Sequence, residues 1–160
     1  MERLLPALGL TAAVFIADQL TKNWVLFGTD ASSQPIAATP FLNIVLVWNR
    51  GISYGLFQTG GAGRWILVAL TLAGTLALLV WLVRARHTLV RFSLGAIVGG
   101  ALGNLVDRVA YGAVVDFIQL HANGFSWYVF NIADAAIVLG VIGLLVDGLF
   151  GRGGKTPSKT

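Results

Sequence analysis

Long runs of apolar residues, interrupted at few positions, dominate the pattern along this chain. The clearest run, residues 65–83, contains nineteen residues without a charge. A helix rises about 1.5 Å per residue, so about 20 such residues cross the hydrocarbon core of a bilayer. Three further segments with the same pattern predict helices over residues 4–27, 90–108 and 131–150. The pattern therefore predicts four transmembrane helices.

The segment between the first two predicted helices has a different pattern. Residues 41–48 are rich in β-branched and aromatic side chains, which favour strands. Asn49 and Gly51 predict a turn, and residues 52–57 are expected to form a return strand. We therefore expect an all-α membrane protein with a small β-structured segment, about residues 30–60, on the outer side.

The chain divides into a single integral-membrane domain, residues 1–150, and a short basic tail, residues 151–160. The tail is rich in Gly, Lys and Thr, and we expect it to be disordered. A cleavable signal peptide is an alternative explanation of the first apolar segment. That segment stays apolar beyond Lys22 and has no convincing small-residue cleavage site before Asp18, so a retained helix is favoured.

Composition supports a membrane protein and excludes several other classes. Apolar residues make up 56% of the 160 residues and charged residues 11%, whereas soluble domains contain about 25% charged residues. The mean hydropathy is +0.79. The absence of cysteine excludes disulfide scaffolds, thiol nucleophiles and thiolate metal sites. Despite a net charge of +4, no basic run is interleaved with aromatics, so nucleic acid is not an expected partner.

The distribution of Lys and Arg predicts the orientation in the membrane. Four spans place both termini and the 84–91 loop on one side, which carries seven of the eleven basic residues. The opposite loops carry three. Because basic loops face the cytoplasm, we expect both termini to be cytoplasmic.

Acidic side chains converge near the outer ends of the predicted helices. They are Asp18, Asp107, Asp116 and Asp134. A carboxylate within the membrane is costly, so such residues usually face the bundle interior and mark function. Asp18 and Lys22 share a helix face, which suits either a structural ion pair or a site role. Asn131 and Asp134 have the spacing of a capping box, so helix capping and a site role are both open for Asp134.

Glycine recurs every four residues in the third predicted helix, and this stripe predicts the close approach of a neighbouring helix. The stripe consists of Gly95, Gly99 and Gly103. A second line at the same spacing consists of Gly100, Asn104 and Arg108. It points an amide and a guanidinium toward one place near the outer surface.

Asp116 stands alone among the apolar residues 114–118, where a structural role is hard to find. If it meets Asp134 in a partly dehydrated site, like charge and low dielectric make the pair share a proton. One carboxylate then acts as a base toward water, while the protonated one polarises a peptide carbonyl. Such hydrolysis needs no cofactor, and His87 and His121 lie on opposite sides, so no metal site is expected.

Five short motifs run through the chain between about residue 10 and residue 145. They are Asp18-Gln19-x-x-Lys22, Asn49-x-Gly51, Gly99-Gly100-Ala101-x-Gly103-Asn104-x-x-Asp107-Arg108, Val115-Asp116-Phe117 and Phe130-Asn131-x-Ala133-Asp134. Together they resemble the bacterial lipoprotein signal peptidase family, also called signal peptidase II. Residues 52–55 depart from the family pattern, which more often has Ala and Phe there.

The resemblance implies an aspartic endopeptidase of the bacterial inner membrane with its active site toward the outer leaflet. Its substrates would be diacylglyceryl-modified prolipoproteins, cut on the amino side of the lipidated Cys among membrane lipids, and a globomycin-like peptide would inhibit it. Asp116 and Asp134 match the family's catalytic pair. Its supporting polar positions are matched by Asp18, Lys22, Asn49, Gly100, Asn104, Asp107, Arg108 and Asn131. One chain of four helices can enclose such a site, so a monomer is expected.

Two other classes of function remain open from the residues alone. A membrane transporter or proton relay also uses intramembrane Asp and Lys residues. It should contain inverted repeats or broken helices, which the sequence does not show. A non-catalytic scaffold would bind neighbouring helices through the glycine stripe and would tolerate isosteric change at the acids.

Overall fold

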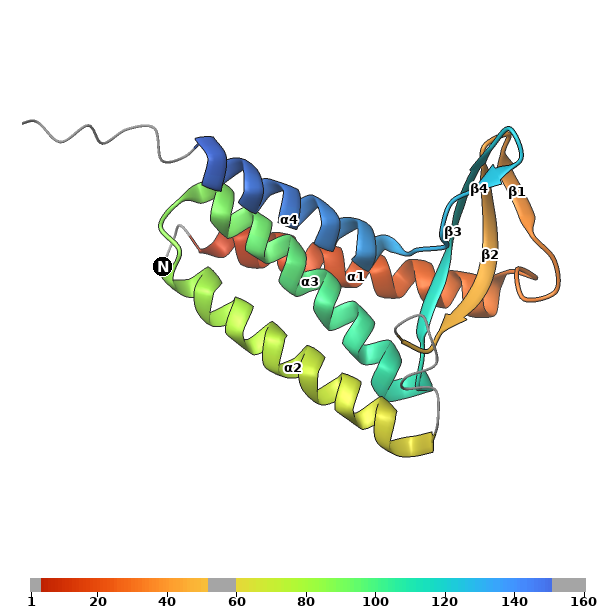
Figure 1. The fold of residues 1–160 in the computed structure, drawn as a ribbon, viewed down its shortest axis with the longest axis horizontal. Helices are drawn as coiled ribbons and strands as arrows, with labels where there is room; N and C mark the ends of the chain where they lie inside the picture. Colours follow the sequence, from red (N-terminus) through yellow and green to blue (C-terminus); the bar gives the residue numbers. More distant parts are fainter. Residues whose placement is uncertain (1–3, 52–59, 151–160) are drawn as a thin grey trace, which may run out of the picture.

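The computed structural model describes residues 4–51 and 60–150. Its elements are α1 (Leu5–Gly28), β1 (Ile36–Thr39), β2 (Leu42–Asn49), α2 (Gly60–Arg84), α3 (Thr88–Tyr111), β3 (Val114–Ala122), β4 (Phe125–Ser126) and α4 (Ile132–Phe150). The four predicted helices are all present, close to their predicted bounds. They lie side by side with the sheet at one end, called the sheet end below, and the start of α1 at the other (Figure 1). The predicted tail lies outside the described residues, and the division into one domain and a tail stays a prediction.

Three of the four helices are long and apolar enough to cross a membrane, over residues 63–84, 88–111 and 132–150. α1 has 24 residues but carries Asp18, Gln19 and Lys22 in its second half, and it is not among these candidates. The chain is therefore mostly helical with three candidate spans, a fourth helix and a small antiparallel sheet.

α3 packs against each of the other three helices. A Cβ added at Gly99 would lie 2.6 Å from the carbonyl oxygen of Thr11, and one at Gly95 would lie 2.7 Å from that of Ala7. Neither distance leaves room for a side chain. The predicted glycine stripe is therefore the surface on which α1 packs.

Gly112 allows the chain to turn sharply between α3 and β3. Its φ of +75° lies in the left-handed region that favours glycine, and its N–H donates to the carbonyl oxygen of Arg108 at 3.2 Å. Arg64 of α2 binds the same helix end, because its Nε donates to the Arg108 carbonyl oxygen at 2.8 Å and its Nη2 donates to that of Val109. The end of α3 is thus fixed from two sides.

The four strands form one antiparallel sheet in the order β1-β2-β3-β4. β2 confirms the strand predicted over residues 41–48, but it pairs with β3, which follows α3. The return strand predicted at residues 52–57 lies outside the described residues. The β structure therefore extends beyond the predicted segment of about 30–60, and β3 brings Asp116 into the sheet.

A small apolar cluster at the sheet end fixes β3 against the end of α1. Its buried members are Val25, Ala31 and Phe117. Successive side chains of a strand point to opposite faces. Because Phe117 is held in this cluster, its neighbour Asp116 is directed to the other face of β3.

Candidate active site

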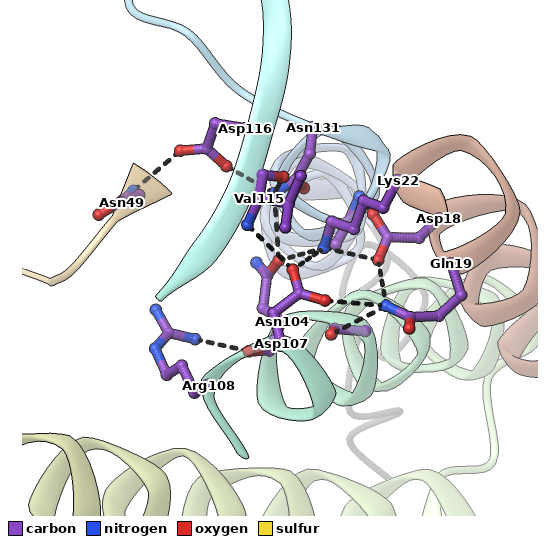
Figure 2. Close-up of polar contacts among 12 residues, drawn as sticks. Asp18, Gln19, Lys22, Asn49, Asn104, Asp107, Arg108, Val115, Asp116 and Asn131 are labelled. Carbon is purple, nitrogen blue, oxygen red and sulfur yellow. Dashed lines mark hydrogen bonds and ion pairs between the residues drawn. The ribbon is translucent and has the colours of Figure 1, made fainter. Parts of the chain in front are cut away.

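Asp116 is 2% exposed and lies opposite Val47 in the sheet. Its Oδ1 accepts a hydrogen bond from Asn131 Nδ2 at 2.7 Å, and its Oδ2 accepts one from Asn49 Nδ2 at 3.0 Å (Figure 2). Asn49 can reach it because Asn49 pairs with Val114, two positions earlier and therefore on the same face of the sheet. Both carboxyl oxygens of Asp116 thus receive an amide N–H.

Burial raises the pKa of Asp116 to about 6, because a carboxylate loses the solvation of water inside the protein. The hydrogen bonds from Asn49 and Asn131 favour the ionised form and lower the pKa, whereas the negative charge of Asp134 raises it. Asp116 is therefore a carboxyl group that can hold a proton close to neutral pH.

Asp134 is the third residue of α4 and forms a reciprocal cap with Asn131. Its N–H donates to Asn131 Oδ1 at 2.9 Å, and its Oδ2 accepts from the Asn131 N–H at 3.3 Å. Its Oδ1 accepts a third hydrogen bond, from Asn104 Nδ2 at 2.8 Å. The capping arrangement considered for Asn131 and Asp134 is therefore present. The same Asp134 carboxyl group also binds the side chain of Asn104.

Asn131 is fully buried and brings the two acids together. Its side chain donates to Asp116 and its backbone N–H donates to Asp134. Its Nδ2 also lies 3.2 Å from the carbonyl oxygen of Val115 and from Asn104 Oδ1. Residues from β3, α3 and the start of α4 therefore meet at one side chain.

Lys22 lies at the centre of a buried ionic cluster that it forms with Asp18 and Asp107. Its Nζ is 2.7 Å from Asp18 Oδ2, 2.7 Å from Asp107 Oδ2 and 2.9 Å from Asn104 Oδ1. The ion pair considered for Asp18 and Lys22 is thus present. Asp107 is a second carboxylate bound to Lys22, and residue spacing alone did not predict this contact. Charges buried in this way persist only when they are paired and hydrogen-bonded.

The two carboxylates beside Lys22 also hold the backbone next to the candidate acids. Asp18 Oδ1 accepts the N–H of Ala133 at 2.9 Å, and Asp107 Oδ2 accepts the N–H of Val115 at 3.1 Å. Ala133 precedes Asp134, and Val115 precedes Asp116. The ionic cluster therefore ties α1 and α3 to the two segments that carry the acids.

Gln19 is a polar contact to which the sequence alone gave no role. Its Nε2 donates to Asp107 Oδ1 at 3.1 Å, to the carbonyl oxygen of Gly103 at 3.2 Å and to Asp18 Oδ2 at 3.3 Å. Gln19 lies three residues before Lys22 on the same helix, and this spacing could have predicted that both side chains lie on one face.

Gly100 and Arg108 lie with Asn104 on the second line of residues predicted on α3, and both contact the surroundings of the candidate acids. A Cβ at Gly100 would collide with the carbonyl oxygen of Ala133, so glycine is needed for the start of α4 to lie against α3. Arg108 is half-buried, and its Nη1 donates to the backbone carbonyl oxygen of Asn104 at 3.2 Å. Its positive charge acts on Asp134 and Asp116 as well as on Asp107.

An apolar groove of about 400 Å³ adjoins Asp134. Its lining consists of Trp127, Tyr128, Phe130, Asp134, Ala135, Val138 and Leu139. The sequence did not predict this groove, because its two walls come from the β4–α4 connection and from α4. Within residues 4–51 and 60–150, no three His, Asp or Glu side chains are grouped so that they could hold a metal; a metal-independent site stays a prediction.

Comparison with known proteins gives similarity over nearly the whole chain. A family model described as "Signal peptidase (SPase) II" matches residues 10–150. A lipoprotein signal peptidase of Methylorubrum extorquens is 58% identical over 139 residues, which cover 86% of this chain and 81% of that protein. One of Methylobacterium radiotolerans is 59% identical over 151 residues, which cover 92% and 88%.

A solved structure has the same fold. It is described as a bacterial membrane enzyme structure obtained by the in meso method at 2.3 Å resolution, and it superposes with a TM-score of 0.81 at 27% identity. The superposition covers 97% of this chain and 94% of that chain. The likeness therefore includes the sheet as well as the four helices.

Proposed function

The chain belongs to the signal peptidase II family, and on this premise we propose that Asp116 and Asp134 are the catalytic pair of a membrane-embedded aspartic endopeptidase. Its substrates are prolipoproteins whose Cys carries diacylglycerol, and it removes the signal peptide on the amino side of that Cys. The observation that carries the assignment is the hydrogen bonding of both carboxyl groups to Asn131.

In the proposed reaction the two acids share one proton. The ionised carboxylate takes a proton from water as the water oxygen attacks the scissile carbonyl carbon, while the protonated carboxyl donates to the carbonyl oxygen. The C–N bond of the tetrahedral intermediate then breaks: the leaving nitrogen takes the proton that the first carboxyl received from water, and the second carboxyl recovers its proton from the intermediate. The products are a signal peptide with a carboxylate end and a lipoprotein whose first residue is the lipidated Cys.

The other polar residues hold the pair and the substrate. Asn49, Asn104 and Asn131 donate hydrogen bonds to the acids. Arg108 is proposed to bind the substrate backbone, because its guanidinium lies in the electrostatic field of both acids. Positions deeper in the bundle support these residues: Asp18, Lys22, Gly100 and Asp107.

The apolar groove beside Asp134 supports a substrate that bears lipid. Apolar walls suit an acyl or aliphatic chain, because such a chain can pass from the bilayer into the groove without losing its apolar surroundings. A substrate that arrives laterally from the bilayer could then place its scissile bond beside the acids while its apolar part stays among lipids. This arrangement favours hydrolysis of a lipid-anchored chain over the transport or proton-relay alternative.

The proposed orientation follows from the arrangement of the helices. The start of α1, the α2–α3 connection and the end of α4 lie at the end opposite the sheet (Figure 1). The excess of Lys and Arg next to these segments in the sequence supports the proposal that this end faces the cytoplasm. With α1 counted as a fourth span, the sheet end lies at the outer leaflet of the bacterial inner membrane. A monomer and inhibition by globomycin-like peptides are part of the same proposal.

Replacement of each acid by its amide tests the function. Asp116→Asn and Asp134→Asn should each lower cleavage of a lipidated precursor peptide in detergent by at least about 10³-fold, since neither amide can exchange the required proton. Asp30→Asn is a matched control, because Asp30 is an exposed acid outside the site. A loss supports the assignment when the variant unfolds at the wild-type temperature, and full cleavage by either site variant would overturn it.

A further inference from the structure

Three asparagine side chains donate hydrogen bonds to the two proposed catalytic acids. They are Asn49, Asn104 and Asn131. A carboxamide has a donating NH₂ side and an accepting oxygen side. If one of these amides turned over, its oxygen would face a carboxylate, and a hydrogen bond would be replaced by repulsion. The orientation of each amide is therefore part of the active site.

Two of these amides are oriented by the backbone. Asn49 Oδ1 accepts the N–H of Gly51 at 3.2 Å, and Asn131 Oδ1 accepts the N–H of Asp134 at 2.9 Å. A backbone N–H can only donate, so it selects the oxygen side of the amide. The NH₂ side is then turned toward the acids.

Asn104 lies inside α3, where backbone N–H groups are engaged within the helix. Its Nδ2 donates to Asp134 Oδ1 at 2.8 Å. Its Oδ1 faces Lys22 Nζ at 2.9 Å and Asn131 Nδ2 at 3.2 Å (Figure 2). An ammonium has three donors and no acceptor, so it selects the oxygen side as firmly as a backbone N–H does.

As an extension of the proposed function, we infer that Lys22 is a positioning residue whose ammonium group holds the Asn104 amide in the orientation that donates to Asp134. Lys22 suits this role because it is buried and its other two donors are bound by Asp18 and Asp107, at 2.7 Å each. With all three N–H groups engaged, Lys22 acts on Asp134 through Asn104.

A purely structural Lys22 would neutralise Asp18 and Asp107 and would have no special link to Asn104. The two roles differ in a double-mutant cycle, which measures whether two residues act through each other. The variants are Lys22→Met, Asn104→Ala and the two combined, with cleavage of a lipidated precursor peptide in detergent as the assay and thermal unfolding as a second readout.

We expect each single variant to lower kcat by a similar factor, on the order of 10²-fold, with KM unchanged within about threefold. In the Asn104→Ala background, Lys22→Met should cause no further loss of kcat, since the amide that it orients is absent. If the two losses multiply, Lys22 acts by another route and the inference is wrong.

Asn23→Met is the matched control on α1. Asn23 is exposed, and its amide donates to the carbonyl oxygen of Gln19 at 2.8 Å, away from the acids. We expect wild-type kcat from this variant. A loss as large as that of Lys22→Met would show a general sensitivity of α1 and would overturn the inference.

Asn104→Asp keeps the inference testable if Lys22→Met fails to fold. In its ionised form the new carboxylate can still accept from Lys22 but cannot donate to Asp134, so this variant is assayed at a pH above the range in which the two neighbouring carboxyl groups share a proton. Its kcat should fall as far as that of Asn104→Ala, and wild-type kcat would refute the role of the donated N–H. A wild-type protein that cannot cut the precursor would overturn both proposals, whereas cleavage by the wild type with multiplying losses would overturn this one alone.

Discussion

The two ends of the helix bundle each contain an acid beside a base, but the pairs differ in burial. At the sheet end, Lys22 and Asp18 are 2.7 Å apart with side chains 2% and 0% exposed. At the opposite end, His87 Nδ1 lies 3.4 Å from Asp147 Oδ1 with side chains 61% and 20% exposed. Water can replace either partner of the exposed pair, but it cannot reach the buried one. Of these two pairs, the buried one at the sheet end is therefore the one that can organise its neighbours.

The largest expected difference between the two ends comes from removing one acid at each. Asp18→Ala leaves Lys22 with one fewer carboxylate and the N–H of Ala133 unpaired, so the free energy of unfolding should fall by about 3–5 kcal/mol. Asp147→Ala should change it by less than about 1 kcal/mol. Thermal or denaturant unfolding in detergent measures both, and equal losses would contradict the comparison.

A smaller difference is expected from adding one methyl group at each end. A Cβ at Gly103 would collide with the Asp18 carboxylate, so Gly103→Ala should destabilise the fold by about 1–3 kcal/mol. Nothing lies within 4 Å of a Cβ at Gly148. Gly148→Ala should therefore be neutral or stabilise by up to about 1 kcal/mol, because alanine favours a helix. Thermal or denaturant unfolding measures both variants. An equal change in the free energy of unfolding for the two would count against the close contact at Gly103.

The smallest expected effect is a pH shift at the exposed edge of the sheet end. The proposed reaction needs one shared proton, so cleavage should decline as the pH rises above the pKa of Asp116, which is about 6. Asn49 stabilises the ionised form of Asp116 and so lowers that pKa. Asn49→Ala should raise the pKa, and the alkaline limb of the kcat/KM profile should move to higher pH.

Asn43→Ala is the control for this measurement, because Asn43 lies in the same strand and donates to Gln119 at 3.3 Å. Its pH profile should match that of the wild type. A limb that stays in place or moves to lower pH in Asn49→Ala would show that the Asn49 amide does not act on the ionised acid.

The helices could be predicted from the sequence because a bilayer imposes a length of about 20 apolar residues on each span. The pairing of β2 with β3 could not. Asn49 and Val114 are partners although two helices lie between them in the sequence. Residues 114–120 have the β-branched and aromatic composition of a strand, but composition does not identify the partner strand.

The candidate acids could be predicted because charges are rare in so apolar a chain, and because the motifs resemble a known family. Their surroundings could not be predicted in the same way. The contacts of Gln19 depend on the rotation of α1 against α3, and the apolar groove depends on how the β4–α4 connection folds over α4. Capping and a site role were alternatives for Asp134 in the sequence, whereas in three dimensions one carboxyl group makes both sets of contacts.

The reciprocal cap between Asn131 and Asp134 has a consequence for inhibitor resistance. A compound that binds these two side chains contacts atoms that also begin α4. A mutation that weakens such binding by shortening either side chain would also remove hydrogen bonds from the first turn of the helix. Escape variants at these positions should therefore carry a folding defect, and resistance should arise more readily at the exposed rim of the groove, at Trp127 or Tyr128.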